Sequence, residues 1–292
     1  MNLFELMMKR RSVRNFLDRE IPESLVGELL DAANNAPSGG NIQPLSIVLV
    51  GEAERRAELA QIVGAQPWVK NAPLSMVFCL DFARVKRWAA LLGVEFKGEQ
   101  ALAHFLIAYA DLICAAQNVV ILAEAHGLGS VYVGTIQSSI DRGREFLALP
   151  RHVLPMMVLS LGYPRSVPKS IPKLARKVIV HRERYCEPSD EEIKEAFEEK
   201  YGEFDARKIA YLEKAYIEVV EADKQEDGNW TGMALEQMKR LEIQNNAQFL
   251  FKLRYPADLM VQLNQLLISS LQRAGFDVLA GMPEAERTVP SP

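Results

Sequence analysis

The sequence predicts a fold of mixed strands and helices (α/β class), followed by a long helical segment. Two patterns support this prediction. Short apolar runs typical of buried strands alternate with helical patterns up to about residue 163. From Pro188 onward the pattern is almost entirely helical. With 292 residues, 49% of them hydrophobic, the chain is long enough for one large domain, or for one domain with an appendage.

The first part is expected to hold four strands separated by helices. The apolar runs that predict strands are 45–50, 74–80, 130–133 and 153–161. Helical patterns cover 3–9, 22–36, 52–62, 104–126 and about 137–147. The run 104–126 is the most apolar of the chain, but four polar residues interrupt it, namely Asp111, Gln117, Asn118 and Glu124. We therefore expect a buried core helix there, and no membrane span.

The second part changes character after Tyr163-Pro164. Residues 165–178 carry prolines and cations and are expected to form a loop. Ser189-Asp190-Glu191-Glu192 is typical of a helix start, Asn229 or Thr231 caps the next helix, and Pro256 begins the last one. We expect a core over 1–185 and a helical extension over 186–292. That extension is a separate subdomain or a set of arms around a partner subunit.

Composition narrows the classes of function. The net charge is −4 with both signs spread along the chain, so we expect no nucleic-acid partner. Cys79, Cys114 and Cys186 lie far apart and the four histidines are scattered, which predicts no metal site and a reducing compartment. The N-terminus lacks a signal-peptide pattern. These features together predict a cytoplasmic protein without a membrane partner.

The most informative motif is Arg10-Arg11-Ser12-Val13-Arg14. In an extended chain, alternate residues share a face, so Arg10, Ser12 and Arg14 would present two guanidinium groups and a hydroxyl together. This set suits a phosphate monoester. The alternative is a solvated basic turn after a helix, where cations complement the C-terminal helix dipole.

Three further segments are weaker alone. Ala36 to Pro44 has two glycines and polar side chains that suit a flat ligand, or it is an ordinary turn. The glycine of Tyr132 to Ile136 frees backbone N–H groups for a ligand, or makes a tight turn. A basic loop follows the last strand, with Lys169, Lys173, Arg176 and Lys177. Neither a nucleophile elbow nor a Rossmann or Walker fingerprint is present, so an enzyme of this sequence would need a cofactor as its reactive centre.

In this order the motifs resemble the nitroreductase family. The resemblance covers residues 4–185 and rests on five segments: Arg10 to Phe16, Ala36 to Pro44, Gly127 to Ser130, the Gly134 turn, and Gly162-Tyr163-Pro164. Gln66-Pro67-Trp68-Val69 and Val180 to Tyr185 are similar to the oxygen-insensitive nitroreductases that also reduce flavin. Those relatives carry a helical C-terminal segment, and Leu271 to Phe276 loosely resembles its end.

The resemblance implies an α+β three-layer sandwich, whose mostly antiparallel central sheet is flanked by helices. It implies a homodimer with FMN at the interface and NADPH or NADH as co-substrate. Arg10, Arg11 and Ser12 would hold the phosphate, Arg14 would lie near flavin N1 and O2, and Gln66 would contact the ring edge or ribityl chain. Val133, Gly134 and Thr135 would face N5 and O4. Pro37, Ser38, Asn41 and Gln43 would reach the flavin of the other subunit. The second phosphate clamp of the family matches only in part, at Lys173 or Arg176.

The implied activity is ping-pong reduction of a small-molecule electron acceptor (a nitroaromatic compound, a quinone or a flavin). Two alternatives remain open. One is a specialised family member with dehydrogenase, deiodinase or flavin destructase chemistry, although the short span 52–71 leaves little room for the lid of a deiodinase. The other is a flavin-binding or interaction protein without catalytic activity.

Overall fold

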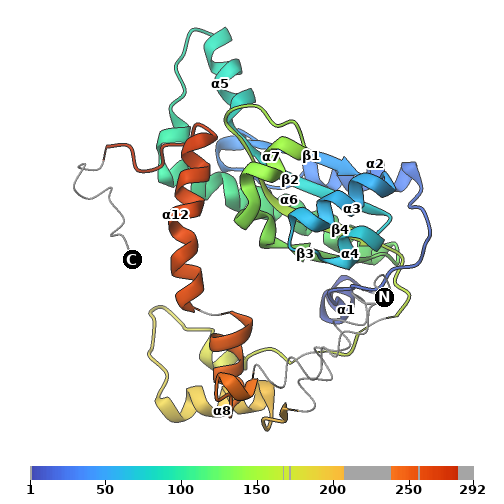
Figure 1. The fold of residues 1–292 in the computed structure, drawn as a ribbon, viewed down its shortest axis with the longest axis vertical. Helices are drawn as coiled ribbons and strands as arrows, with labels where there is room; N and C mark the ends of the chain where they lie inside the picture. Colours follow the sequence, from blue (N-terminus) through green and yellow to red (C-terminus); the bar gives the residue numbers. More distant parts are fainter. Residues whose placement is uncertain (1, 167, 171, 207–237, 256, 282–292) are drawn as a thin grey trace. The chain divides into compact units, whose positions relative to one another are not determined.

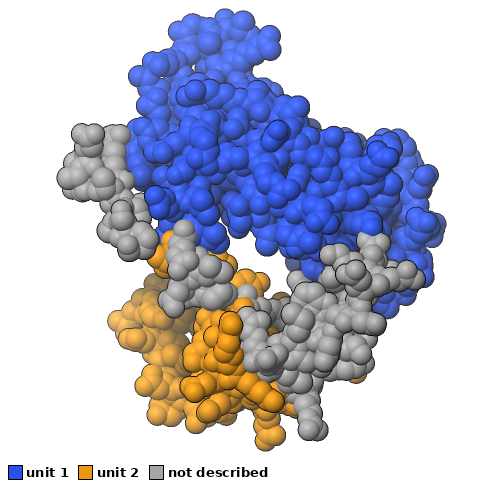
Figure 2. Space-filling model, viewed as in Figure 1, with its two compact units in different colours: residues 1–168, 262–292 blue, residues 169–261 orange. Residues whose placement is uncertain are grey.

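The computed structural model describes residues 2–166, 168–170, 172–206, 238–255 and 257–281. The chain divides into two compact units (Figure 2). Unit 1 comprises residues 1–168 together with 262–292, and unit 2 comprises residues 169–261. The C-terminal residues of the chain thus return to the unit that contains the N-terminus, whereas the sequence suggests one boundary near residue 185.

Unit 1 is built on a four-stranded sheet with helices on both sides (Figure 1). Its strands are β1 (Leu45–Val50), β2 (Leu74–Asp81), β3 (Gly129–Val133) and β4 (Val153–Gly162), in the order β1-β2-β4-β3. Every neighbouring pair is antiparallel. All side chains of β2 are buried, as expected for a central strand that is covered on both faces. Helices connect the strands, as the sequence predicts, and each strand runs antiparallel to its neighbours in the sheet.

The helices of unit 1 begin and end close to the expected residues in most cases. Those that match are α1 (Leu3–Lys9), α2 (Glu23–Asn34), α3 (Ala53–Ile62) and α6 (Leu102–Ala125). The expected helix over 137–147 is wrong at its start, because Gly134–Ser139 forms the 3-10 helix η3 and α7 covers only Ile140–Phe146. The sequence prediction also lacked α4 (Pro67–Asn71) and α5 (Phe82–Leu91).

Helix α6 packs one side against the sheet and against α2. Its buried side chains, from Ala108 to Ala123, join those of β2 and β4 in the main hydrophobic core. Within the described residues, α6 is the one helix long and apolar enough to cross a membrane by length and composition, and a third of its apolar window is buried. The expected core helix is therefore present, but its other face is exposed at Leu102, Leu106 and Ile107.

The last residues of α12 (Ala257–Arg273) complete the core of unit 1. Leu271, Ala274 and Phe276 are buried there, and the Phe276 ring lies 5.6 Å from that of Phe82. Gly275 ends this segment with φ +93°, a conformation that glycine adopts readily. A Cβ at this position would lie 2.7 Å from His152 Nε2. Gly275-Phe276 is thus a docking motif that ties the C-terminal segment to the sheet.

Unit 2 contains α8 (Asp190–Tyr201), α11 (Asn246–Gln248) and the short π-helix η5 (Phe249–Arg254). Ser189 and Glu192 form a reciprocal capping box at the start of α8, which confirms the helix start expected there. Met238, Ile243 and Phe249 form a small core of their own. The expected caps at Asn229 or Thr231 and the helix start at Pro256 lie outside the described residues.

Candidate functional site

The Arg10–Arg14 segment lies along the outer edge of β3. Ser12 forms a parallel bridge with Ser130, and the Val13 N–H donates to the Ser130 carbonyl at 2.9 Å. Val13 is 3% exposed and points into the core, above a glycine, since a Cβ on Gly129 would lie 2.5 Å from it. Ser12 and Arg14 are half-buried and take the opposite face. The alternation expected for this motif is therefore present.

The two arginines before Ser12 differ in their surroundings. The Arg11 guanidinium donates to the carbonyls of Met8 and Arg10 at 2.9 and 2.7 Å, so it is turned back onto its own chain. Both charges act on Glu124, at the end of α6. Burial raises the pKa of the Glu124 carboxyl, and the cations of Arg10 and Arg11 counter this shift only in part. Because the Arg11 guanidinium is bonded to its own backbone, Arg10 is the stronger candidate to meet an external anion.

A set of contacts near the end of β3 involves Arg14, Gln66 and Thr135. The Arg14 guanidinium carbon lies 5.4 Å from the ring centre of Trp68, which is 3% exposed. Two residues earlier, the Gln66 amide donates to Thr135 Oγ1 at 2.9 Å. Thr135 Oγ1 donates in turn to the Val63 carbonyl at 2.6 Å. Residues far apart in the sequence therefore converge here.

Val133 and Gly134 lie where β3 ends and η3 begins, beside this set. Val133 is buried and anchors the turn. A Cβ added to Gly134 would meet nothing nearer than Met157 Cε at 3.9 Å. A ligand can consequently approach the backbone of this turn closely.

The Pro37–Gln43 loop forms a second group, held by the first half of α6. Ser38 Oγ donates to Asp111 Oδ2 at 2.8 Å, and the Gly39 N–H donates to Asp111 Oδ1 at 3.0 Å. The Gln43 amide donates to the Asn34 carbonyl at 3.1 Å, so it is turned toward α2. Pro37, Ser38 and Gln43 help to line a cavity of about 60 Å³.

The two groups contact different parts of α6. The loop is bonded to Asp111, near the middle of the helix, whereas the Arg11 backbone N–H is bonded to Glu124 at its C-terminal end, 13 residues further along. At 1.5 Å per residue this spacing corresponds to ~20 Å. The structure of one chain therefore does not bring Ser38 and Asn41 to the Arg10–Arg14 segment. Lys173 and Arg176 lie in unit 2.

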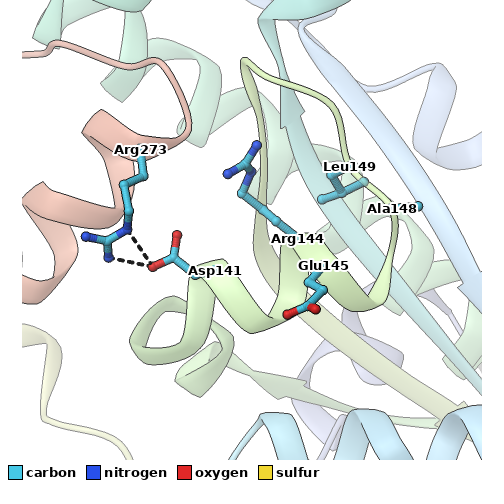
Figure 3. Close-up of a pocket in the computed structure, with 6 residues that line it drawn as sticks. All are labelled: Asp141, Arg144, Glu145, Ala148, Leu149 and Arg273. Atoms are coloured by element: carbon cyan, nitrogen blue, oxygen red, sulfur yellow. Dashed lines mark hydrogen bonds and ion pairs between the residues drawn. The ribbon is translucent and has the colours of Figure 1, made fainter.

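A cavity of about 600 Å³ elsewhere in unit 1 is lined by none of the expected site residues. It lies between α7 and the end of α12, where Arg273 donates to Asp141 (Figure 3). This pair holds the pKa of the Asp141 carboxyl below its ordinary range. Figure 3 shows Arg144 and Glu145 along the same wall. The lining includes two carboxylates, Asp141 and Glu145, and two guanidinium groups, Arg144 and Arg273, so its charges balance.

Sequence reasoning had missed three residues that shape these groups: Trp68, Asp111 and Glu124. The last two stood out only as acidic interruptions of an apolar helix. Their position on a core helix was a usable signal, since a carboxylate on such a helix requires a partner. Within the described ranges, no three His, Cys, Asp or Glu side chains group as metal ligands would.

Comparison with known proteins identifies the family of this chain. The model of the nitroreductase family matches residues 7–163, which is more than half of the chain. An oxygen-insensitive NADPH nitroreductase of Salmonella typhimurium is 33% identical over 202 residues, which are 68% of this chain and 81% of that protein. An FMN reductase (NADPH) of Bacillus subtilis is 32% identical over 196 residues, 65% of this chain and 77% of that protein.

A solved structure is similar over nearly its whole length. The NADPH:FMN oxidoreductase of Vibrio harveyi, complexed with NAD⁺, superposes with a TM-score of 0.63 at 27% identity. The superposition covers 82% of this chain and 97% of that one. The shared antiparallel sheet, the ordered motifs along it and the extent of the family match lead to one conclusion. This chain belongs to the nitroreductase family.

Proposed function

We propose that the protein is an FMN-dependent oxidoreductase that uses NADPH or NADH to reduce a small-molecule acceptor in the cytoplasm. The observation that carries the proposal is the Arg10–Arg14 segment. It is fixed by a strand bridge, with Ser12 and Arg14 on one face, and it adjoins Gln66 and Thr135 through Trp68. The similar proteins named FMN reductase and NADPH nitroreductase carry out chemistry of this class.

The donor set fits FMN. A phosphate monoester needs several charge-assisted donors, which Arg10 and Ser12 supply, with Lys173 or Arg176 as candidates for a second clamp. The flavin ring needs hydrogen-bond partners along one edge, which the Gly134 turn and the Gln66–Thr135 pair offer. FMN, when bound, supplies the redox centre, so no protein nucleophile is required.

The chain's own residues then position the ligand and provide a positive potential. Arg10 and Ser12 hold the phosphate, and Arg14 places a cation near N1 and O2, where negative charge develops on reduction. The Trp68 ring keeps the Arg14 guanidinium in place. Val13, buried in the core, fixes the register of the whole segment against β3.

The site is completed by a second copy of the chain. Within one chain, the Pro37–Gln43 loop contacts the middle of α6 and the Arg10–Arg14 segment its C-terminal end, and a two-fold partner would bring its loop to this chain's segment. The exposed face of α6 and that of α1 are apolar, at Leu106 and Ile107 and at Phe4 and Met8. Faces of this kind on a soluble protein mark a binding surface. The proposed enzyme is therefore a homodimer with two shared sites.

The structure also favours simple electron transfer over lid-dependent chemistry. The connection between β1 and β2 consists of α3 and α4, whose buried residues, among them Leu59 and Val69, belong to the packed interior. A substrate-clamping lid would have to grow from this connection. A site without such a lid would suit acceptors of varied shape, such as nitroaromatics, quinones and free flavin.

Purification provides the first test. The protein should be yellow and should release FMN on denaturation, and NADPH or NADH should bleach the bound flavin in stopped-flow absorbance. Steady oxidation of the nicotinamide with a quinone distinguishes an enzyme from a flavin-binding protein. Recovery of FAD, or a colourless protein that FMN does not titrate, contradicts the proposal.

Mixed dimers test the shared sites. Arg10→Ala and Asn41→Ala chains with different affinity tags are combined, and the heterodimer is isolated. One of its sites collects both defects, while the other regains wild-type residues, so half of the wild-type activity should return. Absence of recovery in a verified heterodimer would show that each chain builds its own site.

A further inference from the structure

The Pro37–Gln43 loop adopts a backbone that needs support from outside. Gly40, Asn41 and Gln43 have φ values of +58°, +54° and +51°. For residues other than glycine, this left-handed region is strained, and it persists only where the surroundings impose it. Gly39 is pressed against α6, because a Cβ there would lie 2.5 Å from Ile107 Cγ2.

Asp111 supplies that support. Its carboxylate accepts hydrogen bonds from Ser38 Oγ at 2.8 Å and from the Gly39 N–H at 3.0 and 3.1 Å. Ser38 Oγ in turn accepts from the Gln43 N–H at 3.0 Å. One half-buried carboxylate, 72 or more residues away in the sequence, therefore holds both ends of the strained segment. It binds Ser38 and Gly39 directly, and it holds Gln43 through the Ser38 hydroxyl. Hydrogen bonds to a charged group are the strong kind.

The same helix turn borders the exposed apolar face. Ile107, one turn before Asp111, is 48% exposed and touches the loop, and Cys114 is exposed one turn beyond. The anchor of the loop and the surface proposed to meet the partner thus share one stretch of α6. In the proposed dimer, a rigid loop at this place would already have its binding conformation when it contacts the partner's flavin.

We infer that Asp111 is the positioning residue that holds the Pro37–Gln43 loop in the shape that contacts the partner's FMN. The inference rests on the proposed function, and it assigns to Asp111 an effect on the other chain's site and none on its own cradle of Arg10, Ser12 and Arg14. Asp111 does not touch the flavin in this arrangement; it acts through Ser38 and Gly39.

Binding of FMN is the first measurement. Asp111→Ala should weaken FMN binding at least ten-fold by fluorescence quenching, whereas Asp111→Asn, whose single oxygen can still accept from the Gly39 N–H, should weaken it less. Asp31→Asn, an exposed carboxylate on α2, is the matched control and should bind as the wild type does. The thermal unfolding midpoint of each apoprotein shows which variants are folded. If Asp111→Ala does not fold, Asp111→Asn takes its place in each measurement.

Mixed dimers then separate positioning from general damage. Paired with Arg10→Ala, the Asp111 variant should restore one tight FMN site per dimer, because its own cradle is intact. Paired with Asn41→Ala, it should restore none, because both loops are then defective. Equilibrium dialysis counts the sites without reference to turnover.

Each outcome has one meaning. A tight site in the Asp111/Asn41 pair, or wild-type affinity in folded Asp111→Ala, overturns the inference. No recovery in the Arg10/Asn41 pair overturns the shared site that is part of the proposed function. This result can be told apart from a failure of the role assigned to Asp111, because the Arg10/Asn41 pair contains no Asp111 variant.

Discussion

At the scale of single residues, the Ser12–Val13 pair shows how one backbone bridge assigns neighbouring side chains to separate tasks. Val13 fills space above Gly129 and is buried, while Ser12 and Arg14 face outward. A shift of one residue along β3 would exchange these faces. The packing of Val13 therefore sets the positions of the polar side chains beside it.

Replacement of Arg10 by alanine should weaken FMN binding by at least about 1.5 kcal/mol, the lower range for a hydrogen bond to a charged group. The Arg11 guanidinium is bonded to the carbonyls of Met8 and Arg10, whereas Arg10 is expected on the same face as Ser12 and Arg14. Calorimetric titration of the apoprotein with FMN measures the loss. Arg11→Ala serves as the matched comparison and should cost less; an equal or larger loss would reverse these assignments.

Replacement of Arg14 should act mainly on the redox equilibrium. Loss of a cation near the reduced ring makes reduction less favourable, so Arg14→Ala should lower the reduction potential of the bound flavin. Spectroelectrochemistry at equal FMN occupancy measures the shift, with Arg14→Lys, which keeps the charge, as control. An unchanged potential with weakened binding would place Arg14 with the phosphate ligands instead.

At the scale of elements, apolar runs predicted the strands well, since β1 has the expected bounds and β2 and β4 each extend one residue further. Helix α5 was missed although Asp81, which accepts a hydrogen bond from the Arg84 N–H, is a regular N-cap. The strand pattern ran directly into it, so no turn residue separated the two elements. Local signals therefore identified periodic elements and failed where one element begins at the last residue of another.

The residues of the candidate site, like the strands and helices, were predictable where the local sequence pattern is distinctive. Arg10–Arg14, Gln66 and Gly134 lie in segments with recognisable composition, and the structure brings three of these segments together. Asp111 was not identified as a site residue, because its partners Ser38 and Gly39 are distant in sequence. Nothing local to an apolar helix tells which loop will fold against one of its carboxylates.

The docking of α12 onto unit 1 should depend on pH. His152 packs against Phe276 with ring centres 6.2 Å apart, and its backbone N–H donates to the Ala274 carbonyl. Burial lowers the pKa of His152, and Lys86 and Arg151 lower it further, although Glu99 opposes them. Folding therefore favours the neutral ring. The stability that results is complete above the unfolded pKa of about 6.5 and is lost as the pH falls through the lower folded value.

Urea unfolding at pH 7.5 and pH 5 measures this loss of free energy. A His152→Gln variant should lose less stability on acidification than the wild type does. His126, which is exposed beside Glu28, gives the matched control as His126→Gln. Equal pH dependence in all three proteins would show that His152 does not control the docking.

At the scale of the whole molecule, the exposed apolar residues of α1 and α6 predict self-association. Leu106 is 57% exposed on the face that we expect to be covered by the partner. Leu106→Glu would place a charge in that interface without a partner, which is strongly unfavourable. We expect the variant to sediment as a monomer and to lose tight FMN binding.

The matched control for this prediction is Gln61→Glu on the exposed side of α3, which adds the same charge away from the apolar face. It should remain dimeric and yellow. A Leu106→Glu protein that stays dimeric with full FMN content would show that the subunits meet elsewhere.

The return of the C-terminal segment to unit 1 has a consequence for how this chain tolerates changes in length. Residues 169–261 leave unit 1 and come back to it, so unit 2 is an insertion within a domain and not a tail. Insertions and deletions there alter a closed loop, whose entropy changes only slowly with its length. Truncation from the C-terminus that extends as far as Phe276, in contrast, removes a buried side chain and opens the core. Variation among descendants of this gene should therefore concentrate inside the insertion, while the last helix is retained.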